Sequence, residues 1–193
     1  MNINNLELHY FSHPYNRTDF NERRIEIPLA MKFLELVNND CTEIGCVVPY
    51  YFETKHKVID LYDPHRSAQN IDALTYDYSN QNCLSISTIE HFGEIYNDPN
   101  NIGKYFDKDL SFKGLKLIIE KANKYLVSFP IGTNISLDES VKSSTLPFFI
   151  LKRDHDNNWS LDETKSLNYK YGFPFGNANA ICIVTNMKEF YAK

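Results

Sequence analysis

The hydrophobic positions between residues 41 and 91 form three short runs, CTEIGCVV, HKVIDLYD and NCLSISTIEH, and each closes on acidic or turn-forming residues. The runs stay apolar on successive positions, as strands buried on both faces do, whereas a half-exposed strand would alternate. If these strands are parallel, their carboxyl ends meet at one edge of a doubly wound sheet, where ligands bind. The pattern therefore predicts both an α/β fold and the location of a site.

The chain before the first run is expected to contain an arm and a helix. Residues 1–18 read as an irregular arm, and an apolar stripe over 19–37 predicts a helix with Asp19 or Asn21 as its cap. Pro28 lies inside this stripe, so the helix either kinks there or begins there.

The remaining elements follow from the same patterns. Strands are predicted at 41–48, 57–62, 83–89 and 125–129, with a weak strand around 73–76. Ser111 is expected to cap a helix after the polar loop 93–110, and 137–143 permits only a short turn or two of helix. The strands at 147–151 and 180–185 have no long helix between them, which predicts an antiparallel hairpin that closes the sheet.

Length and composition fit this fold. With 193 residues, the chain is expected to form a single Rossmann-like α/β domain, with a mostly parallel twisted sheet, helices on both faces and an antiparallel strand near the C-terminus. The net charge is −5 and the 20 basic residues are scattered, which argues against a nucleic-acid surface. No apolar stretch approaches the roughly 20 residues that span a bilayer, so no membrane span is predicted.

The N-terminus and the cysteines indicate a compartment. The polar start MNINNLELHYFSHPYN lacks the apolar core of a signal peptide, which predicts a cytoplasmic protein. Cys41, Cys46, Cys83 and Cys182 lie inside or next to predicted strands without a CxxC pair, so buried free thiols are expected rather than a disulfide or zinc site. The Asp154-His155-Asp156 stretch reads as a solvated turn, and no metal is predicted.

The first run supplies Glu43 and Gly45. A glycine at the first strand end lets the backbone approach a ligand where any Cβ would collide, and a carboxylate there can accept hydrogen bonds from a ligand ammonium group or from backbone amides. GxGxxG is absent, because Cys46, Val47 and Val48 stand where further glycines would be. The loop is therefore a poor binding site for the pyrophosphate of a dinucleotide. A glycine at an ordinary strand end is the alternative reading.

The second run supplies Asp60 and Asp63. A carboxylate at the end of the second strand commonly accepts hydrogen bonds from the hydroxyl groups of an adenosine ribose. Asp60 follows the aliphatic part of the run and is the preferred residue, whereas Asp63 precedes Pro64 and fits a turn as well.

These motifs, in this order, resemble class I S-adenosylmethionine-dependent methyltransferases. The segments that carry the resemblance are NERRIEIPLA, TEIGCVVPYYF, VIDLYD, SISTIEHFG and VSFPIGTN, and the resemblance covers about Asn21 to Thr185. They are most similar to a small methyltransferase-like group associated with surface-glycan biosynthesis. The glycine-poor first loop and Asn82-Cys83, which stands where an acidic residue is usual, are departures from the pattern.

The resemblance implies S-adenosylmethionine as cofactor and assigns residues to it. Glu43 and Gly45 would lie near the methionine moiety, and Asp60 would bind the ribose. Asp72, with Asp77 as the alternative, would lie near the adenine. Ser87 and Thr88 would line the cofactor from the other side of the site.

The pair Glu90-His91 follows Ser87 and Thr88 in the sequence, and its side chains are of types that act as general acids and bases. The unperturbed pKa of histidine lies near neutrality, which suits it to remove the proton of an alcohol during methyl transfer. The alternative is structural, with His91 bonded to the strand-end loop and Glu90 paired with an arginine.

The predicted function is O-methylation of a sugar or another small hydroxyl acceptor. Two alternatives stay open: a catalytically silent methyltransferase-like binding module, and an α/β enzyme that processes nucleotides or sugar nucleotides in the same crevice. Whether the protein forms a homodimer is left open by the sequence.

Overall fold

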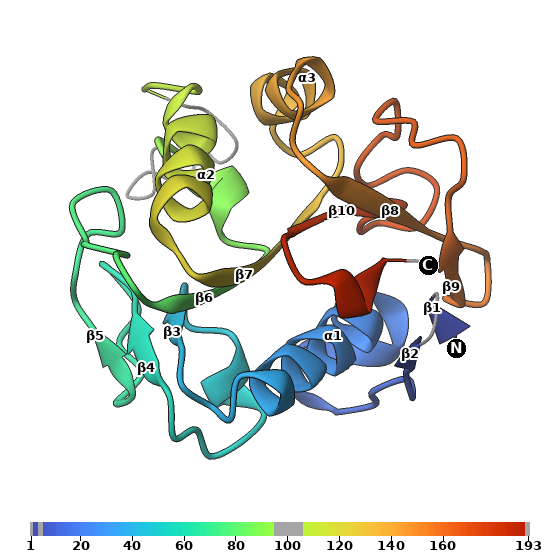
Figure 1. The fold of residues 1–193 in the computed structure, drawn as a ribbon. Coiled ribbons are helices and arrows are strands. Elements are labelled where there is room, and N and C mark those ends of the chain that lie inside the picture. Colours follow the sequence, from blue (N-terminus) through green and yellow to red (C-terminus); the bar gives the residue numbers. More distant parts are fainter. Residues whose placement is uncertain (1, 4–5, 95–105, 192–193) are drawn as a thin grey trace.

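The computed structural model describes residues 2–3, 6–94 and 106–191 and forms an α/β domain around an eight-stranded sheet (Figure 1). The strands of this sheet are β3 Thr42–Ile44, β4 Lys57–Ile59, β5 Ala68–Gln69, β6 Asn82–Ile86, β7 Lys124–Pro130, β8 Phe148–Arg153, β9 Trp159–Leu161 and β10 Ala180–Thr185. Their spatial order is β5-β4-β3-β6-β7-β10-β8-β9. The first five pair in parallel, whereas β10 is antiparallel to β7 and β8, and β9 is antiparallel to β8.

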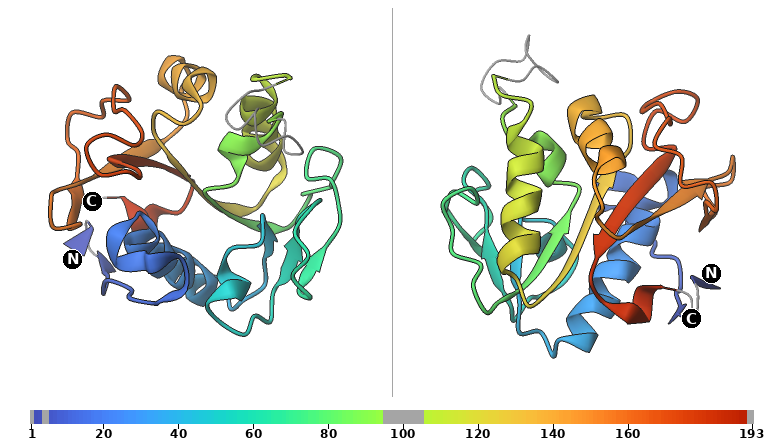
Figure 2. Two further views of the ribbon diagram at one scale, coloured as in Figure 1. Left: turned by 180° about the vertical axis from the view of Figure 1, so that it is seen from behind. Right: turned by 45° about the horizontal axis from the view of Figure 1, so that its top comes forward.

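Helices cover both faces of the sheet, as the continuous apolar runs predict (Figures 1 and 2). Helix α1 (Arg23–Leu36) packs on one face, and α2 (Leu110–Lys121) and α3 (Ile135–Ser143) pack on the other. Within β7, Leu126 joins the α1 core, while its neighbours Tyr125 and Val127 join the core of α2 and α3. This alternation explains why the strand is apolar at every one of these positions.

Helix α1 runs through Pro28 rather than beginning there. Proline lacks an N–H group, so the carbonyl of Arg24 has no partner four residues later in the helix. The backbone N–H of Phe11 donates to that carbonyl at 3.0 Å, so the N-terminal arm supplies the missing bond. Asn21 acts at the helix start, because its Oδ1 accepts from Arg23 N at 3.0 Å, whereas Asp19 accepts from Ser12 Oγ.

The arm itself contains more structure than predicted. Strands β1 (Asn2–Ile3) and β2 (Leu6–Glu7) pair with each other, and a 3-10 helix spans Tyr15–Phe20. The prediction of an irregular arm over residues 1–18 is therefore wrong for these short segments.

The weak strand predicted at 73–76 is wrong, because the third parallel strand is β5 and residues 73–75 form a turn. Asp72 Oδ1 accepts from Leu74 N at 2.9 Å, and Tyr78 OH donates to the carbonyl of Ala73 at 2.6 Å. These local hydrogen bonds hold the backbone in a turn and compete with strand pairing.

Ser111 does not cap α2, which begins at Leu110. Its buried Oγ donates to the carbonyls of Glu90 and Phe92 at 3.3 and 3.1 Å, so it joins α2 to the loop after β6. The polar loop predicted at 93–110 lies mostly outside the described residues, which omit 95–105.

The antiparallel pairing of β8 and β10 is confirmed, but the two strands do not simply close the sheet. Strand β10 inserts between β7 and β8, and the polar stretch with Trp159 forms the edge strand β9. All four cysteines are buried and free, as the sequence predicts. Within the described ranges, no helix is long and apolar enough to cross a membrane.

The strand order places a crevice between β3 and β6. From β3 the chain proceeds outward to β4 and β5, and it then returns to β6 and continues in the opposite direction to β7. The connections therefore diverge beyond the carboxyl ends of β3 and β6, and in open α/β sheets ligands bind at this position.

Candidate functional site

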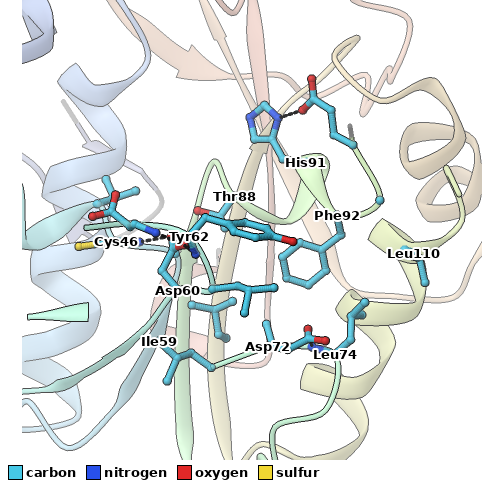
Figure 3. A pocket seen from close by; sticks show the side chains of 18 of the residues that line it. Cys46, Ile59, Asp60, Tyr62, Asp72, Leu74, Thr88, His91, Phe92 and Leu110 are labelled. Carbon is cyan, nitrogen blue, oxygen red and sulfur yellow. Dashed lines mark hydrogen bonds and ion pairs between the residues drawn. The ribbon is translucent and has the colours of Figure 1, made fainter. Parts of the chain in front are cut away.

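A pocket of about 500 Å³ opens at the carboxyl ends of β3, β4 and β6 (Figure 3). Gly45 follows β3, Asp60 follows β4, and Ser87 and Thr88 follow β6, and all four line the pocket. Its volume falls within the range of small-molecule sites, which is roughly 300 to 1,000 Å³. The apolar residues that line it are Ile44, Val47, Ile59, Leu61, Ala73, Leu74, Phe92, Phe106 and Leu110.

The structure brings most of the predicted site residues to this pocket. They are Gly45, Asp60, Asp72, Ser87, Thr88 and His91, together with the alternative residue Asp63. Glu43 and Glu90 are buried and do not line the pocket, and Asp77 lies on an exposed turn away from it. The carboxyl edge of the sheet therefore collects both polar groups and an apolar wall.

Gly45 occupies a position that no other residue fits. Its φ is +84°, and a Cβ atom added to it would lie 2.0 Å from Thr88 Oγ1. Its N–H donates to the carbonyl of Ile59 at 2.9 Å, which holds the turn against β4. The backbone of this turn and the end of β6 thus approach each other at the pocket because residue 45 has no side chain.

The buried carboxylate of Glu43 holds the turn after β3 through hydrogen bonds. One of its carboxylate oxygens accepts from the N–H groups of Val47 and Val48 at 2.9 and 2.8 Å, and the other lies 2.6 Å from Nε2 of the buried His56. Anionic ligands in α/β folds are held by free N–H groups of this kind. Here they are occupied, and the chain after β3 forms a 3-10 turn over Val48–Tyr50 instead of a long helix. A pyrophosphate group therefore has little to bind at this turn.

Asp60 organises the loop after β4. Its Oδ1 accepts from the N–H groups of Tyr62 and Asp63, each at 3.0 Å, and its Oδ2 accepts from Cys46 N at 3.1 Å. A carboxylate has about four accepting positions, so one remains for a ligand hydroxyl. Asp63 accepts from Tyr50 OH and from His65 N. Asp60 therefore links the first and second strand ends around the pocket.

The far side of the pocket is lined mainly by apolar side chains, with Asp72 among them. Asp72 and Leu74 come from the segment after β5, Phe92 from the segment after β6, and Leu110 from the start of α2 (Figure 3). Phe92 packs on α2 at Gly114, where a Cβ atom would lie 2.6 Å from the ring. An apolar lining with a carboxylate among its side chains suits a flat heteroaromatic ring, which contributes both an apolar face and polar atoms along its edge.

His91 lies between two carboxylates. Its Nδ1 is 2.5 Å from Glu94 Oε2, the contact marked by a dashed line at His91 in Figure 3. Its Nε2 is 3.6 Å from Glu90 Oε1. The histidine side chain is about one-third exposed, whereas Glu90 is buried, and burial raises the pKa of Glu90 well above its ordinary value. Asn134 Nδ2 donates to the Glu90 carbonyl at 3.1 Å and fixes this loop. A histidine held in this way can accept or release a proton at the pocket wall.

A second buried network centres on Glu26 of α1. Its carboxylate pairs with Arg23 and accepts from Ser87 Oγ at 2.8 and 3.0 Å and from Ser128 Oγ at 2.7 Å. Glu22 is buried beside it, and burial, followed by the charge of Glu26, raises the pKa of Glu22. Although burial alone lowers it, the carboxylates of Glu26 and Glu22 bring the pKa of Arg23 above its ordinary value.

Sequence reasoning missed Glu26 and Glu94, both of which contact predicted site residues. Glu94 stands three residues after His91, a spacing that signals a local contact. Glu26 stands three and four residues before Leu29 and Ala30, so it falls on the buried side of the helix, where an unpaired carboxylate would be costly. A glutamate on the buried side of the predicted helix was therefore the signal in the sequence that could have identified Glu26.

No known protein family and no curated protein matches this chain when its sequence is compared with them. Across the ranges that the structure describes, no group of three or more His, Cys, Asp or Glu side chains is arranged to hold a metal ion. The evidence for function is therefore the pocket itself.

Proposed function

We propose that this protein is an S-adenosylmethionine-dependent methyltransferase that methylates a hydroxyl group of a sugar or another small molecule. The observation that carries the proposal is the convergence of Gly45, Asp60 and Thr88 around one pocket at the carboxyl edge of the sheet. The resemblance of the sequence motifs to methyltransferases supplies the reaction, and the group that the motifs resemble, which is associated with surface-glycan biosynthesis, supplies the class of acceptor. Buried free cysteines fit a protein of the reducing cytoplasm.

The strand order supports this proposal. Numbered along the chain, the five parallel strands from β5 to β7 lie in the order 3-2-1-4-5, which is the order found in Rossmann-like folds. In those folds the ligand lies across the ends of strands 1, 2 and 4, and these correspond to β3, β4 and β6. The pocket occupies the same three strand ends.

The residues present fit an adenosyl cofactor. Asp60 keeps accepting capacity for ribose hydroxyls, and the apolar side chains of Leu74 and Phe92 in the pocket lining suit an adenine base. The first turn offers no free N–H cluster for phosphates, because Glu43 occupies those of Val47 and Val48. A cofactor without phosphate groups is therefore favoured over a dinucleotide, and this weighs against an enzyme that processes nucleotides.

When bound, S-adenosylmethionine supplies an activated methyl group, so the protein mainly has to align the acceptor and exclude water. In the proposed reaction His91 accepts the proton of the acceptor hydroxyl as the new O–C bond forms. Glu94 stabilises the resulting imidazolium through its contact with Nδ1, and Nε2 is the nitrogen that takes the proton. Ser87 and Thr88 line the same pocket as His91.

The test is the melting temperature with added S-adenosylhomocysteine, with NAD and a uridine diphosphate sugar as comparison ligands. A ligand that binds only the folded state stabilises it in a concentration-dependent way, by about 2.7 kcal/mol at a hundred times Kd. We expect a shift with S-adenosylhomocysteine and none with the other two. No shift at millimolar S-adenosylhomocysteine would overturn the proposal, and a shift with the uridine diphosphate sugar alone would support the nucleotide-processing alternative.

A mass-shift screen then separates an enzyme from a silent binding module. The protein is incubated with S-adenosylmethionine and a panel of sugars and sugar nucleotides, and each is examined for the gain of one methyl group. Methylation of an acceptor identifies the enzyme, whereas binding of the cofactor without methylation of any acceptor in the panel favours the binding module.

A further inference from the structure

Glu26, in the N-terminal turn of α1, is hydrogen-bonded to Ser87, which lines the pocket. This carboxylate is fully buried and contacts three elements that are distant in the sequence: Arg23 of its own helix, Ser87 after β6 and Ser128 in β7. A buried carboxylate is stable only where hydrogen bonds and an opposite charge compensate its lost hydration. Glu26 has both, so its position is tightly specified.

Ser87 is the member of this network that belongs to the pocket. Its φ is +38°, a conformation that residues other than glycine adopt rarely and at some cost in free energy. Two donors oppose that cost: the single Oγ proton is shared between both oxygens of Glu26, and the backbone N–H donates to the carbonyl of Ser128 at 2.9 Å. The strained backbone therefore depends on a side chain of α1.

Thr88 connects the conformation of Ser87 to the ligand site. Thr88 follows Ser87 directly, and its Oγ1 faces Gly45 at a distance that leaves no room for a Cβ atom on that glycine. A change in the backbone at Ser87 moves Thr88 either into the pocket or away from Gly45. The contact between Glu26 and Ser87 therefore acts on the part of the pocket that Thr88 and Gly45 line.

We infer that Glu26 is a positioning residue for the ligand site: it does not line the pocket, but it fixes the backbone of Ser87 and Thr88 in the conformation that binds the cofactor. The Asn-Glu-Arg-Arg segment at the start of α1 is, by this inference, part of the binding machinery through Arg23, which pairs with Glu26. The inference rests on the proposed function for the identity of the ligand.

Ser87→Ala and Ser128→Ala form a matched pair. Each removes one hydroxyl that donates to the same Glu26 oxygen, at 2.8 and 2.7 Å, but only Ser87 lines the pocket. Loss of a hydrogen bond to a charged group weakens an interaction roughly 10- to 100-fold. We expect Ser87→Ala to raise the Kd of S-adenosylhomocysteine by such a factor and Ser128→Ala to change it by less than about threefold. Equal effects of the two variants would overturn the inference.

Glu26→Gln tests the carboxylate itself, with Glu35→Gln as its control. Glu35 is exposed on the same helix and pairs with Lys32. We expect Glu26→Gln to raise the Kd of S-adenosylhomocysteine. In the double variant, adding Ser87→Ala should raise this Kd little further, because both substitutions break the same bond. Unchanged affinity in Glu26→Gln, or additive losses in the double variant, would contradict the positioning role.

Amide hydrogen exchange in the ligand-free protein separates this inference from the proposed function. We expect Glu26→Gln to accelerate exchange of the Ser87 amide by about tenfold or more relative to the amides of α2, which report global stability. If the wild-type protein binds no S-adenosylhomocysteine, the proposed function fails, and the exchange rates alone decide the role of Glu26. Unchanged exchange at Ser87 would then overturn it.

Discussion

Gly45 and Thr88 lie so close across the pocket that a Cβ atom on Gly45 would be 2.0 Å from Thr88 Oγ1. They belong to the turn after β3 and to the end of β6, the two adjacent strands where the chain reverses its direction of progress through the sheet. The side chain of Thr88 therefore packs directly on the turn at Gly45, and both residues line the pocket.

Replacing Gly45 by alanine is expected to abolish the binding of S-adenosylhomocysteine, because the new methyl group displaces Thr88 and strains a backbone with φ of +84°. Gly176→Ala is the control, since Gly176 also has a positive φ, of +77°, but nothing lies within 4 Å of its added Cβ. Both variants should lose about 1 to 2 kcal/mol of stability from the left-handed backbone alone. Calorimetric titration measures the affinity, and equal binding by the two variants would contradict the role of the close approach.

Asp60→Asn is expected to weaken cofactor binding roughly 10- to 100-fold, because it removes a charged acceptor at the second strand end. Asp63→Asn serves as the comparison, since Asp63 also lines the pocket but accepts from Tyr50 OH and His65 N. Titration of both variants with S-adenosylhomocysteine decides between them. If only Asp63→Asn binds weakly, Asp63 is the ribose ligand and the assignment of Asp60 is wrong.

His91→Ala is expected to lower kcat by roughly 10²- to 10⁴-fold, the usual contribution of a general base, while the Kd of the cofactor changes little. Turnover is measured with an acceptor found by the mass-shift screen. His155→Ala is a suitable control, because His155 is exposed and packs on Phe175 away from the pocket. Unchanged kcat in His91→Ala would leave His91 with a structural role only.

The unfolding free energy of Glu90→Gln minus that of the wild-type protein is expected to increase as the pH rises. Burial raises the pKa of Glu90 above its ordinary value of 4.5, so the folded state favours the protonated acid. The resulting stability is complete below the unfolded-state pKa and is lost as the pH rises through the folded-state pKa. Glutamine does not titrate and avoids this loss.

Urea unfolding at pH 5 and pH 8 measures this effect through the difference in unfolding free energy between Glu90→Gln and wild type. Glu53→Gln provides the control, because Glu53 is exposed. A difference that stays constant or shrinks with pH would show that the buried Glu90 does not titrate in this way.

Glu43→Ala is expected to destabilise the fold by about 3 kcal/mol or more, because it leaves the N–H groups of Val47 and Val48 and the buried His56 without their acceptor. Thermal unfolding of this variant beside Glu53→Ala measures the loss. A small change in stability combined with lost cofactor binding would instead assign Glu43 to the ligand.

Much of the framework follows from the sequence. The runs from Cys41 to His91 are apolar at successive positions because helices cover both faces of their strands, and this pattern suffices to predict a buried α/β sheet and the edge where its site lies. Gly45 and Asp60 were found at this edge because they directly follow two of these strands. Such signals are local, since each depends on neighbouring residues alone.

Other features depend on contacts between distant segments, and only the tertiary structure decided them. Strand β5 consists of two residues whose pairing with β4 defines it, and β10 inserts between β7 and β8 although it follows both in the chain. Glu26 reaches Ser128 across 102 positions. Hydrophobic periodicity records which face of an element is buried, but the partner of a buried polar group is set by the fold, so no local pattern identifies it.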